Sequence, residues 1–269
     1  MRLLSLLLLC ATPALAERID PAALDHLPAA DVVVLGEVHD NPEHHANQAR
    51  AVAALQPRAL VFEMLTQAEA ARAPADRNDP KALAAAFGWE GSGWPDFALY
   101  HPIFLAAPAA RIYGGEVERD QARLAVSQGA SAVFGADAAL YGLDQPLPEA
   151  EAAARAEEQF SAHCGAMPME MMDGMVEAQR LRDATLARAV LQAMQETGGP
   201  VAVITGTEHA RKDRGVPAAL ALAAPGLRVL AIGQAEEDPG VGAPFDLWLV
   251  TAPAPRPDPC AAFAPPSDG

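Results

Sequence analysis

The sequence predicts an α/β protein with a mostly parallel sheet, flanking helices and a helical insertion. Residues 31–38 form a short β-branched run without polar alternation, which is typical of a strand buried on both faces. A helical stretch and a second apolar run, 59–65, follow it, and this spacing indicates a βαβ unit with parallel strands. Because no repeat or clear linker divides the chain, we expect one domain over 17–251.

Local signals predict the remaining elements in order. Asn41 has the side chain of an N-cap and Pro42 suits the first helical position, so a helix should run from there to about Leu55. The face expected to be buried carries Ala46, Ala49, Val52 and Ala53. The further elements expected are a helix 81–87, a strand 110–117, a helix 118–125, two helices within 148–197 broken at 165–168, a strand 201–205, a helix 217–224, and strands 227–233 and 246–251.

The composition excludes several classes of partner. The chain of 269 residues has a net charge of −16, which argues against nucleic acid because phosphate binding needs a basic face. The same charge argues against docking on anionic lipid. Hydrophobic residues make up 51% of the chain, so a sizeable core is expected rather than disorder.

Residues 1–16 have the pattern of a signal peptide. Arg2 is positive, 3–9 form a mainly apolar stretch, and 14–16 read Ala-Leu-Ala, the small-x-small pattern before a cleavage site. We therefore expect a periplasmic or secreted protein whose mature chain begins near Glu17. No later segment is apolar enough to span a bilayer.

An alternative for the N-terminus is a lipoprotein anchored through Cys10. The preceding Leu9 is bulky where a small residue is expected, which favours the cleaved signal peptide. Cleavage would leave Cys164 and Cys260, and two cysteines in an oxidising compartment predict one disulfide. This bond would pin the Pro-rich C-terminal tail, 252–269, to the body of the protein.

Two predicted strands are followed by the same Gly-x-x-His pattern. Residues 36–39 read Gly-Glu-Val-His, and residues 206–209 read Gly-Thr-Glu-His. Ligands gather beyond the carboxyl ends of the strands in open α/β sheets, so both histidines should meet at one edge. Each glycine is expected to let the backbone bend sharply behind its strand.

Side chains near the strand ends could carry chemistry, namely Glu37, His39, Glu63, Glu116 and His209. Two imidazoles beside carboxylates suit a divalent metal held by His39, Glu63 and His209, or acid–base catalysis in which Glu37 also takes part. The alternative is that each histidine caps a turn by hydrogen bonding. The signatures of zincins, P-loop enzymes and Gly-x-Ser-x-Gly hydrolases are missing.

Two residues near the predicted pocket could bind a cofactor. His44 lies in the first turn of its helix, where the positive N-terminal potential should keep the imidazole neutral, as a metal or haem iron requires. Its neighbour His45 is expected to be solvated. Tyr100 lies in the aromatic stretch 94–106, which should cover a pocket as a loop or short helix, and a Tyr phenolate can ligate haem iron.

The predicted helical insertion holds two further candidates. Residues 167–175 contain five of the eight methionines, Met171 among them. Thioethers bind Cu(I) or line apolar pockets, and the alternative is ordinary helix packing. Arg182 and Asp183 are adjacent on a helix and cannot pair along one face, so one could point into the site, or both could be solvated.

A family resemblance rests on five segments that follow in order along nearly the whole mature chain: 34–41, 61–64, 94–104, 178–187 and 205–217. With these segments the chain resembles the ChaN-type haem-binding uptake family of the Tiki superfamily. The last segment is the most specific, because its Gly-x-x-His is followed by a basic turn and Gly-Val-Pro.

This resemblance implies an erythromycin esterase/ChaN-like fold and an exported haem-binding protein that acts in haem and iron uptake. Haem is the implied cofactor, and Arg182, Met171, Tyr100 and His44 are the expected pocket residues. A homodimer and envelope haem-uptake components are left open as partners. More distant relatives, the Tiki-type proteases and erythromycin esterases, are hydrolases. They make a metal-dependent or His/Glu-dependent hydrolase the alternative, with Glu37, His39, Glu63 and His209 carried over by motif.

Overall fold

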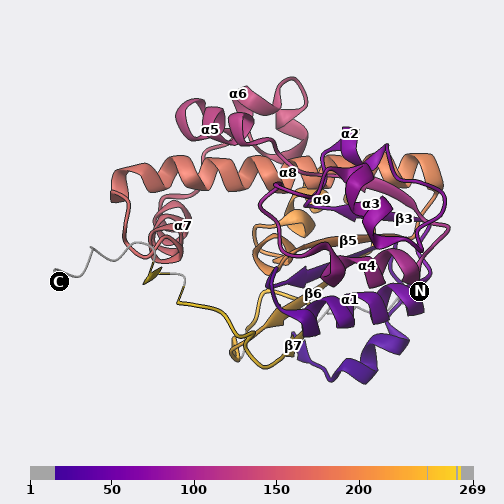
Figure 1. Ribbon diagram of the computed structural model, residues 1–269. Coiled ribbons are helices and arrows are strands. Elements are labelled where there is room, and N and C mark those ends of the chain that lie inside the picture. Colours follow the sequence, from indigo (N-terminus) through magenta and orange to yellow (C-terminus); the bar gives the residue numbers. More distant parts are fainter. Residues whose placement is uncertain (1–15, 241, 259, 262–269) are drawn as a thin grey trace, which may run out of the picture.

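The residues described by this computed structural model, 16–240, 242–258 and 260–261, contain a seven-stranded sheet with helices on both faces (Figure 1). The strand order is β1-β7-β6-β2-β5-β3-β4, and every neighbouring pair is parallel, which confirms the predicted α/β class. The strands are β1 (Glu17–Arg18), β2 (Val32–Glu37), β3 (Ala59–Phe62), β4 (Arg111–Gly114), β5 (Val201–Gly206), β6 (Val229–Ala235) and β7 (Leu247–Val250).

Helices form the outer layers of the fold. The α-helices are α1 (Pro42–Leu55), α2 (Gln67–Ala70), α3 (Pro80–Phe87), α4 (Phe97–Ala106), α5 (Arg119–Gln128), α6 (Ala130–Phe134), α7 (Glu149–Ala162), α8 (Met172–Thr197) and α9 (Val216–Ala223). The 3₁₀ helices are η1 (Pro21–His26), η2 (Ala138–Tyr141), η3 (Met169–Met171) and η4 (Thr207–Ala210).

The two apolar cores lie on opposite faces of the sheet, because successive strand residues point to opposite sides. Val33 and Leu35 of β2 pack with apolar residues of α1 and α4, whereas Val32 and Val34 pack with α8 and α9. Figure 1 shows α8 along one side of the sheet and α1 along the other. Burial on both faces explains why these strands read as continuous apolar runs.

The neighbouring strands β2 and β5 form the topological switch point of the sheet. The helix after β2, α1, belongs to one face, and the helix after β5, α9, belongs to the other. The two strands pair in register, with Glu37 opposite Gly206. Because the chain leaves these two neighbouring strands toward opposite faces, a crevice opens between them at the carboxyl edge of the sheet. This is where ligands bind in α/β proteins.

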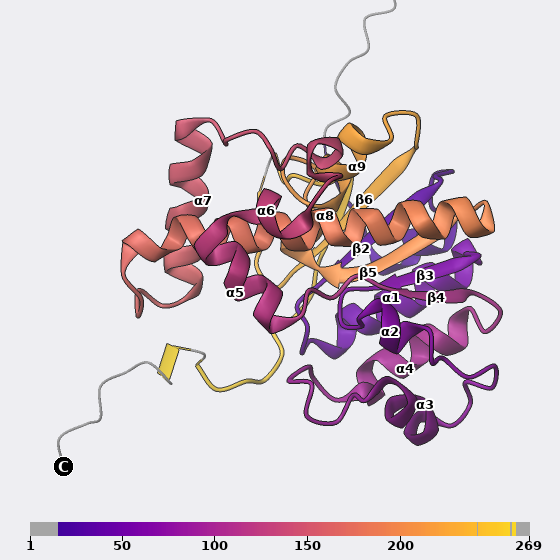
Figure 2. The ribbon, with the colours of Figure 1, turned by 90° about the horizontal axis from the view of Figure 1, so that it is seen from above.

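The predicted helical insertion is formed by α7 and α8, with η3 in the interruption between them. Viewed from above, α7 projects beyond the sheet beside the N-terminal part of α8 (Figure 2). The insertion therefore extends past the sheet on the side where α8 begins.

Three expectations for local structure were wrong in detail. The buried face of α1 carries His44, His45 and Gln48 beside Ala51 and Val52, and each of the three polar side chains makes at least one hydrogen bond there. The third strand, β4, ends at Gly114 instead of continuing to residue 117. The glycines of the two motifs lie within β2 and β5 and neither has a positive φ, so they do not form the sharp bend that was expected behind each strand.

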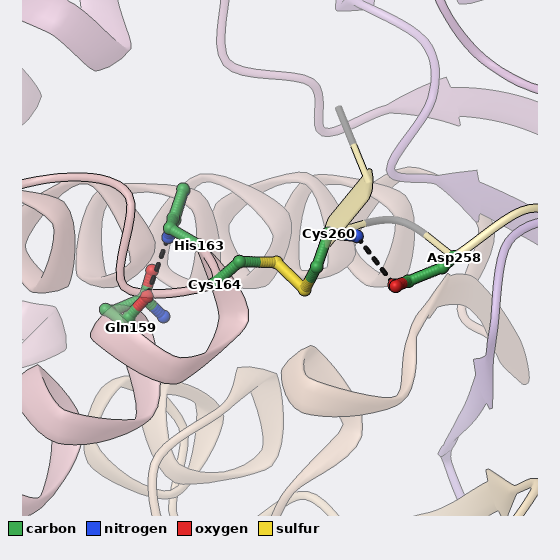
Figure 3. Close-up of a disulfide and its surroundings, with 5 residues drawn as sticks. All are labelled: Gln159, His163, Cys164, Asp258 and Cys260. Atoms are coloured by element: carbon green, nitrogen blue, oxygen red, sulfur yellow. Dashed lines mark hydrogen bonds between the residues drawn. A yellow bond between two sulfur atoms is a disulfide. The ribbon is translucent and has the colours of Figure 1, made fainter. Parts of the chain in front are cut away.

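The Cys164–Cys260 disulfide is present, with the Cα atoms 5.5 Å apart (Figure 3). It confirms the predicted link between the tail and the helical insertion. Arg256 holds the same tail segment by ion pairs with Asp40 and Glu236. The predicted signal peptide up to residue 15, Cys10 within it, and residues 262–269 of the tail lie outside the described residues. Within the described part, no helix combines the length and apolar character needed to cross a membrane.

Candidate functional site

A cavity of about 850 Å³ lies at the carboxyl edge of the sheet. Its lining comes from the segments that follow β2, β3, β4, β5 and β6, and from α7 and α8. Glu37, His39, Glu63 and His209 all line it, so the structure brings the four strand-end residues of the motif analysis into one cleft. The switch point between β2 and β5 accounts for this meeting.

The two motif glycines allow the chain segments to approach closely. A Cβ atom on Gly206 would lie 3.1 Å from Nε2 of His39, and one on Gly36 would lie 2.9 Å from Cα of Thr207. Both contacts are tighter than ordinary packing allows. The glycines therefore make room for the neighbouring motif, instead of providing the sharp bend that their sequence position suggested.

Glu63 lies at the centre of the polar cluster. Its Oε2 accepts hydrogen bonds from Oγ1 of Thr205 at 2.6 Å and from the backbone N–H of Gly206 at 2.7 Å. Its Oε1 lies 4.0 Å from Nε2 of His39 and 3.5 Å from Nε2 of His209. Burial favours the neutral acid, but the two imidazoles and the hydrogen bonds outweigh it and lower the pKa of Glu63.

His39 is held by a hydrogen bond to the carboxylate of Glu37. Nδ1 of His39 lies 2.7 Å from Oε1 of Glu37, and the same oxygen accepts a 2.9 Å hydrogen bond from the Tyr100 hydroxyl. Burial opposes charging of the imidazole, yet the Glu37 bond and the charge of Glu63 raise the pKa of His39. The ring also packs edge-on against Trp94, with centroids 4.9 Å apart.

His209 is held between two carboxylates. Its Nδ1 lies 2.6 Å from Oδ1 of Asp183 on α8, while its Nε2 faces Glu63. Burial again disfavours the charged ring, but Glu63 and Asp183 dominate and raise the pKa of His209 to about 9. The imidazole is therefore protonated at neutral pH.

The name polar floor is used below for the cluster of five charged and imidazole side chains just described, namely Glu37, His39, Glu63, Asp183 and His209. Asp183 is the member that the sequence did not assign to the site. Its signal was the adjacent pair Arg182–Asp183 in the middle of a helix, and the structure shows that both residues line the cavity. Asp183 turns toward His209, which no local pattern could have revealed.

A second set of residues, from α7, the residue that follows it and α8, also lines the cavity. The helical wall is defined here as Arg155, Gln159, His163, Met175 and Arg182. Arg182 forms no hydrogen bond or ion pair with any described residue. Trp94 and Val117 add apolar surface to the cavity, and Glu116 also lines it. Burial, with help from the carboxylate of Glu69, raises the pKa of Glu116 to about 7.

Three of the four residues predicted to contact a cofactor do not line the cavity. Tyr100 is fully buried, and burial together with the Glu37 carboxylate raises the pKa of its phenol far above the ordinary value. A phenolate ligand is therefore disfavoured there. Met171 is 44% exposed in η3, outside the lining, and Met175 takes the place on the cavity that the methionine-rich run suggested. Of the four candidates, only Arg182 faces the cavity.

His44 is the third of these residues, and it lies inside the protein. Its Nδ1 accepts the Val38 N–H at 2.7 Å, and its Nε2 bonds to Oγ1 of Thr251 at 2.8 Å. The imidazole is neutral as expected, but the main cause is burial, which lowers its pKa to about 4. His45, expected to be solvated, is buried as well and bonds to the carbonyl of His39, so that expectation was wrong.

A divalent metal site finds no support in the described residues, where no group of three or more His, Cys, Asp or Glu side chains is arranged to hold an ion. Both nitrogens of His209 face carboxylates, Asp183 at Nδ1 and Glu63 at Nε2. The floor is suited instead to holding and moving protons, with Glu37 orienting His39 and Asp183 orienting His209.

The fold and this site together define an α/β protein with one large cavity at the carboxyl edge of its sheet. The chain belongs to the family described as haem-binding uptake, Tiki superfamily, ChaN, whose model matches residues 23–220. No curated protein matches the chain significantly.

A solved structure supports the same fold. ChaN of Campylobacter jejuni, in a structure that describes cofacial haem binding, aligns with a TM-score of 0.60 at 19% identity. The alignment covers 80% of this chain and 86% of that one. The type III effector HopBA1 aligns with a TM-score of 0.43 at 12% identity over 87% of this chain and 92% of its own. At 19% identity the likeness to the Campylobacter protein concerns the fold alone.

Proposed function

We propose that the cavity at the carboxyl edge binds haem as cargo during iron uptake. Membership of the haem-binding uptake family supports the ligand. The observation that carries the location is the cavity itself, whose volume of about 850 Å³ lies toward the upper end of typical ligand sites, roughly 300–1,000 Å³.

The cavity lining fits the chemistry of haem. Trp94, Val117 and Met175 offer apolar and polarisable surface for a flat macrocycle. Arg182 can pair with a propionate carboxylate, because no described side chain occupies its guanidinium. When bound, haem would supply an iron centre, and the histidines that line the cavity are the residues that would be available to hold it.

The direct test is titration of the purified protein with haemin, followed by absorption in the Soret region. We expect a shifted band that saturates at a fixed ratio. Met175→Glu, which places a charge on the apolar side of the cavity, should weaken binding. The matched control Met169→Glu, at an exposed position outside the lining, should leave binding unchanged. A wild-type protein that leaves the haemin spectrum unaltered at micromolar concentration contradicts the proposal.

Export and assembly belong to the same proposal. We infer export from the signal-peptide pattern of residues 1–16, and cell fractionation checks it. ChaN of Campylobacter jejuni binds haem cofacially, and we extend this mode to the present chain. A cofacial pair needs two haem molecules, so the titration should end at two haems per chain, or at one haem per chain accompanied by dimer formation in sedimentation velocity. One haem on a monomer would rule out the cofacial mode.

A second candidate function, hydrolysis, is favoured by the polar floor. Two imidazole–carboxylate pairs, His39–Glu37 and His209–Asp183, face each other across Glu63. Such pairs can shuttle protons to and from a substrate. An ester and peptide library, tried with and without divalent metals, is the assay. His39→Ala and His209→Ala should abolish turnover while His26→Ala, at an exposed position, keeps it. Absence of turnover in the wild-type protein under all conditions removes this candidate.

A further inference from the structure

Helix α7 is held to the rest of the protein by few buried contacts. Of its 14 residues, only Ala156 is buried. The helix packs on α8 and on η3, the two elements that follow it in the chain. A helix that buries so little apolar surface opens locally at a low cost in free energy. Further links therefore decide whether α7 stays in place.

The position of α7 also decides how open the cavity is. Arg155, Glu158, Gln159 and Ala162 of this helix line the cavity, beside segments that follow the strands of the sheet and beside α8. A displacement of α7 would remove its part of the lining, while the sheet and α8 would keep theirs. The helix is therefore placed to control access to the cavity.

An ion pair and a disulfide tie α7 to the carboxyl edge of the sheet. Glu158 is paired with Arg214, in the segment that follows the second Gly-x-x-His motif. The side chain of Glu158 is 49% exposed, so water and salt weaken this pair. The covalent link begins at Cys164, directly after the C-cap residue of α7, and ends at Cys260 of the tail (Figure 3). The disulfide is the stronger of the two ties.

The tail that carries Cys260 is itself anchored at the carboxyl edge. Arg256 is paired with Asp40 and Glu236, and Cys260 follows it by only four positions. Prolines at every second position of 253–257 restrict the backbone and stiffen this part of the tail. Figure 1 shows the tail running from β7 toward the end of α7. An intact disulfide thus fastens the end of α7 to the sheet through a short, stiff connection.

The disulfide lies where a reductant can reach it. Cys164 and Cys260 are both only partly buried, and neither belongs to one of the two apolar cores. Breaking the bond removes no strand pairing and exposes no core residue. The sheet can therefore persist while the end of α7 is released.

We propose that the Cys164–Cys260 disulfide is a reducible clasp, which a protein dithiol of the Cys-x-x-Cys class opens to release α7 and widen access to the cavity. A thiolate of the dithiol attacks one sulfur, forms a mixed disulfide and displaces the other cysteine as a thiolate. The second thiolate of the dithiol then attacks the mixed disulfide and releases the second cysteine. Two electrons and two protons pass to Cys164 and Cys260, which become thiols, and the reductant becomes a disulfide.

The consequence for the cargo rests on the proposed haem site. With the clasp closed, α7 stays beside the cavity and haem exchanges slowly. With the clasp open, α7 is held by its packing and by the pair between Glu158 and Arg214, so haem exchanges faster.

The first arm of the test needs no haem. The purified protein is treated with reduced thioredoxin without denaturant, its thiols are counted by alkylation, and amide hydrogen exchange is followed by mass spectrometry. We expect two thiols to appear and the protection of α7 to fall at least about fivefold, the lower end of typical coupling between sites, while β2 and β5 stay protected. Cys164→Ser/Cys260→Ser should show the fast α7 exchange with or without thioredoxin.

The second arm measures transfer of haemin from the loaded protein to an excess of apomyoglobin. Reduction should speed this transfer at least about fivefold in wild type. The matched control is Cys164→Ser/Cys260→Ser, whose transfer rate should not respond to thioredoxin.

The outcomes of the two arms are distinguishable. Thiols that react only in denaturant, or unchanged α7 protection after reduction, overturn the clasp. Loss of protection in β2 and β5 as well would show that reduction unfolds the protein, and this also overturns it. Faster α7 exchange with an unchanged haemin transfer rate overturns the control of the cargo. If wild type binds no haemin, the proposed function fails, and the exchange arm still decides whether the clasp exists.

Discussion

The polar floor and the helical wall face the same cavity but differ in how their polar groups are satisfied. On the floor each imidazole is paired with carboxylates, so the charges of the protein neutralise one another. On the wall, Arg182 and Nε2 of His163 have no partner among the described residues and remain available to a ligand. A motif that occurs twice in the sequence therefore marks the floor, whereas the groups available to bind a ligand lie in the helical insertion.

The largest expected effect comes from breaking the floor at Asp183. Asp183→Ala leaves His209 buried without its closest carboxylate, and the loss of one partner of a buried pair costs about 4 kcal/mol. Urea unfolding should show this loss, while Asp173→Ala, at an exposed position in the first turn of the same helix, should cost under about 1 kcal/mol. Equal unfolding free energies for Asp183→Ala and Asp173→Ala would mean that the contact between Asp183 and His209 does not stabilise the fold.

The next effect concerns the link that holds the wall. The double variant Cys164→Ser/Cys260→Ser should lose about 3 kcal/mol of unfolding free energy, because the disulfide restricts the unfolded chain. The same variant should bind haemin more weakly than wild type, since the end of α7 is no longer tied to the sheet edge. Thermal unfolding and haemin titration measure the two effects. Weaker stability with unchanged haemin affinity would separate the disulfide from ligand positioning.

An effect of similar size is expected from pH, and it also probes the floor. The pKa of His209 is about 9 in the folded protein against 6.5 for an ordinary histidine, so the folded state binds this proton more tightly. The resulting stabilisation is complete below pH 6.5 and is lost as the pH rises through 9, on the order of 3 kcal/mol. NMR titration of the imidazole, with exposed His26 as the internal reference, measures it. A His209 midpoint near 6.5 would show that the two carboxylates do not hold the proton.

The smallest expected effect tests whether Arg182 of the helical wall contacts the propionates of the ligand. Arg182→Ala should weaken haemin binding by about two- to fivefold, because a partly solvated ion pair contributes under about 1 kcal/mol. Arg123→Ala, on exposed α5 surface, is the matched control. Fluorescence quenching by haemin gives both affinities. An affinity of Arg182→Ala equal to that of the control would place the propionates elsewhere.

The sequence by itself predicts the class of the fold and the order of its elements, because both depend on local periodicity, caps and turn residues. It also places four side chains at strand ends, namely Glu37, His39, Glu63 and His209. The pairing of Cys164 with Cys260 follows as well, since the predicted mature chain holds only these two cysteines. Such features require no knowledge of which segments become neighbours.

Only the tertiary structure decided which side chains meet. Strands β2 and β5 are separated by most of the chain, and their adjacency puts His39 within reach of Glu63 and His209. The same folding turns Asp183 toward His209 and buries Tyr100 and His44, all of which local patterns left open. The direction of a side chain on a helix has meaning only once the packing partners are known. Strand order is a non-local choice that periodicity does not encode.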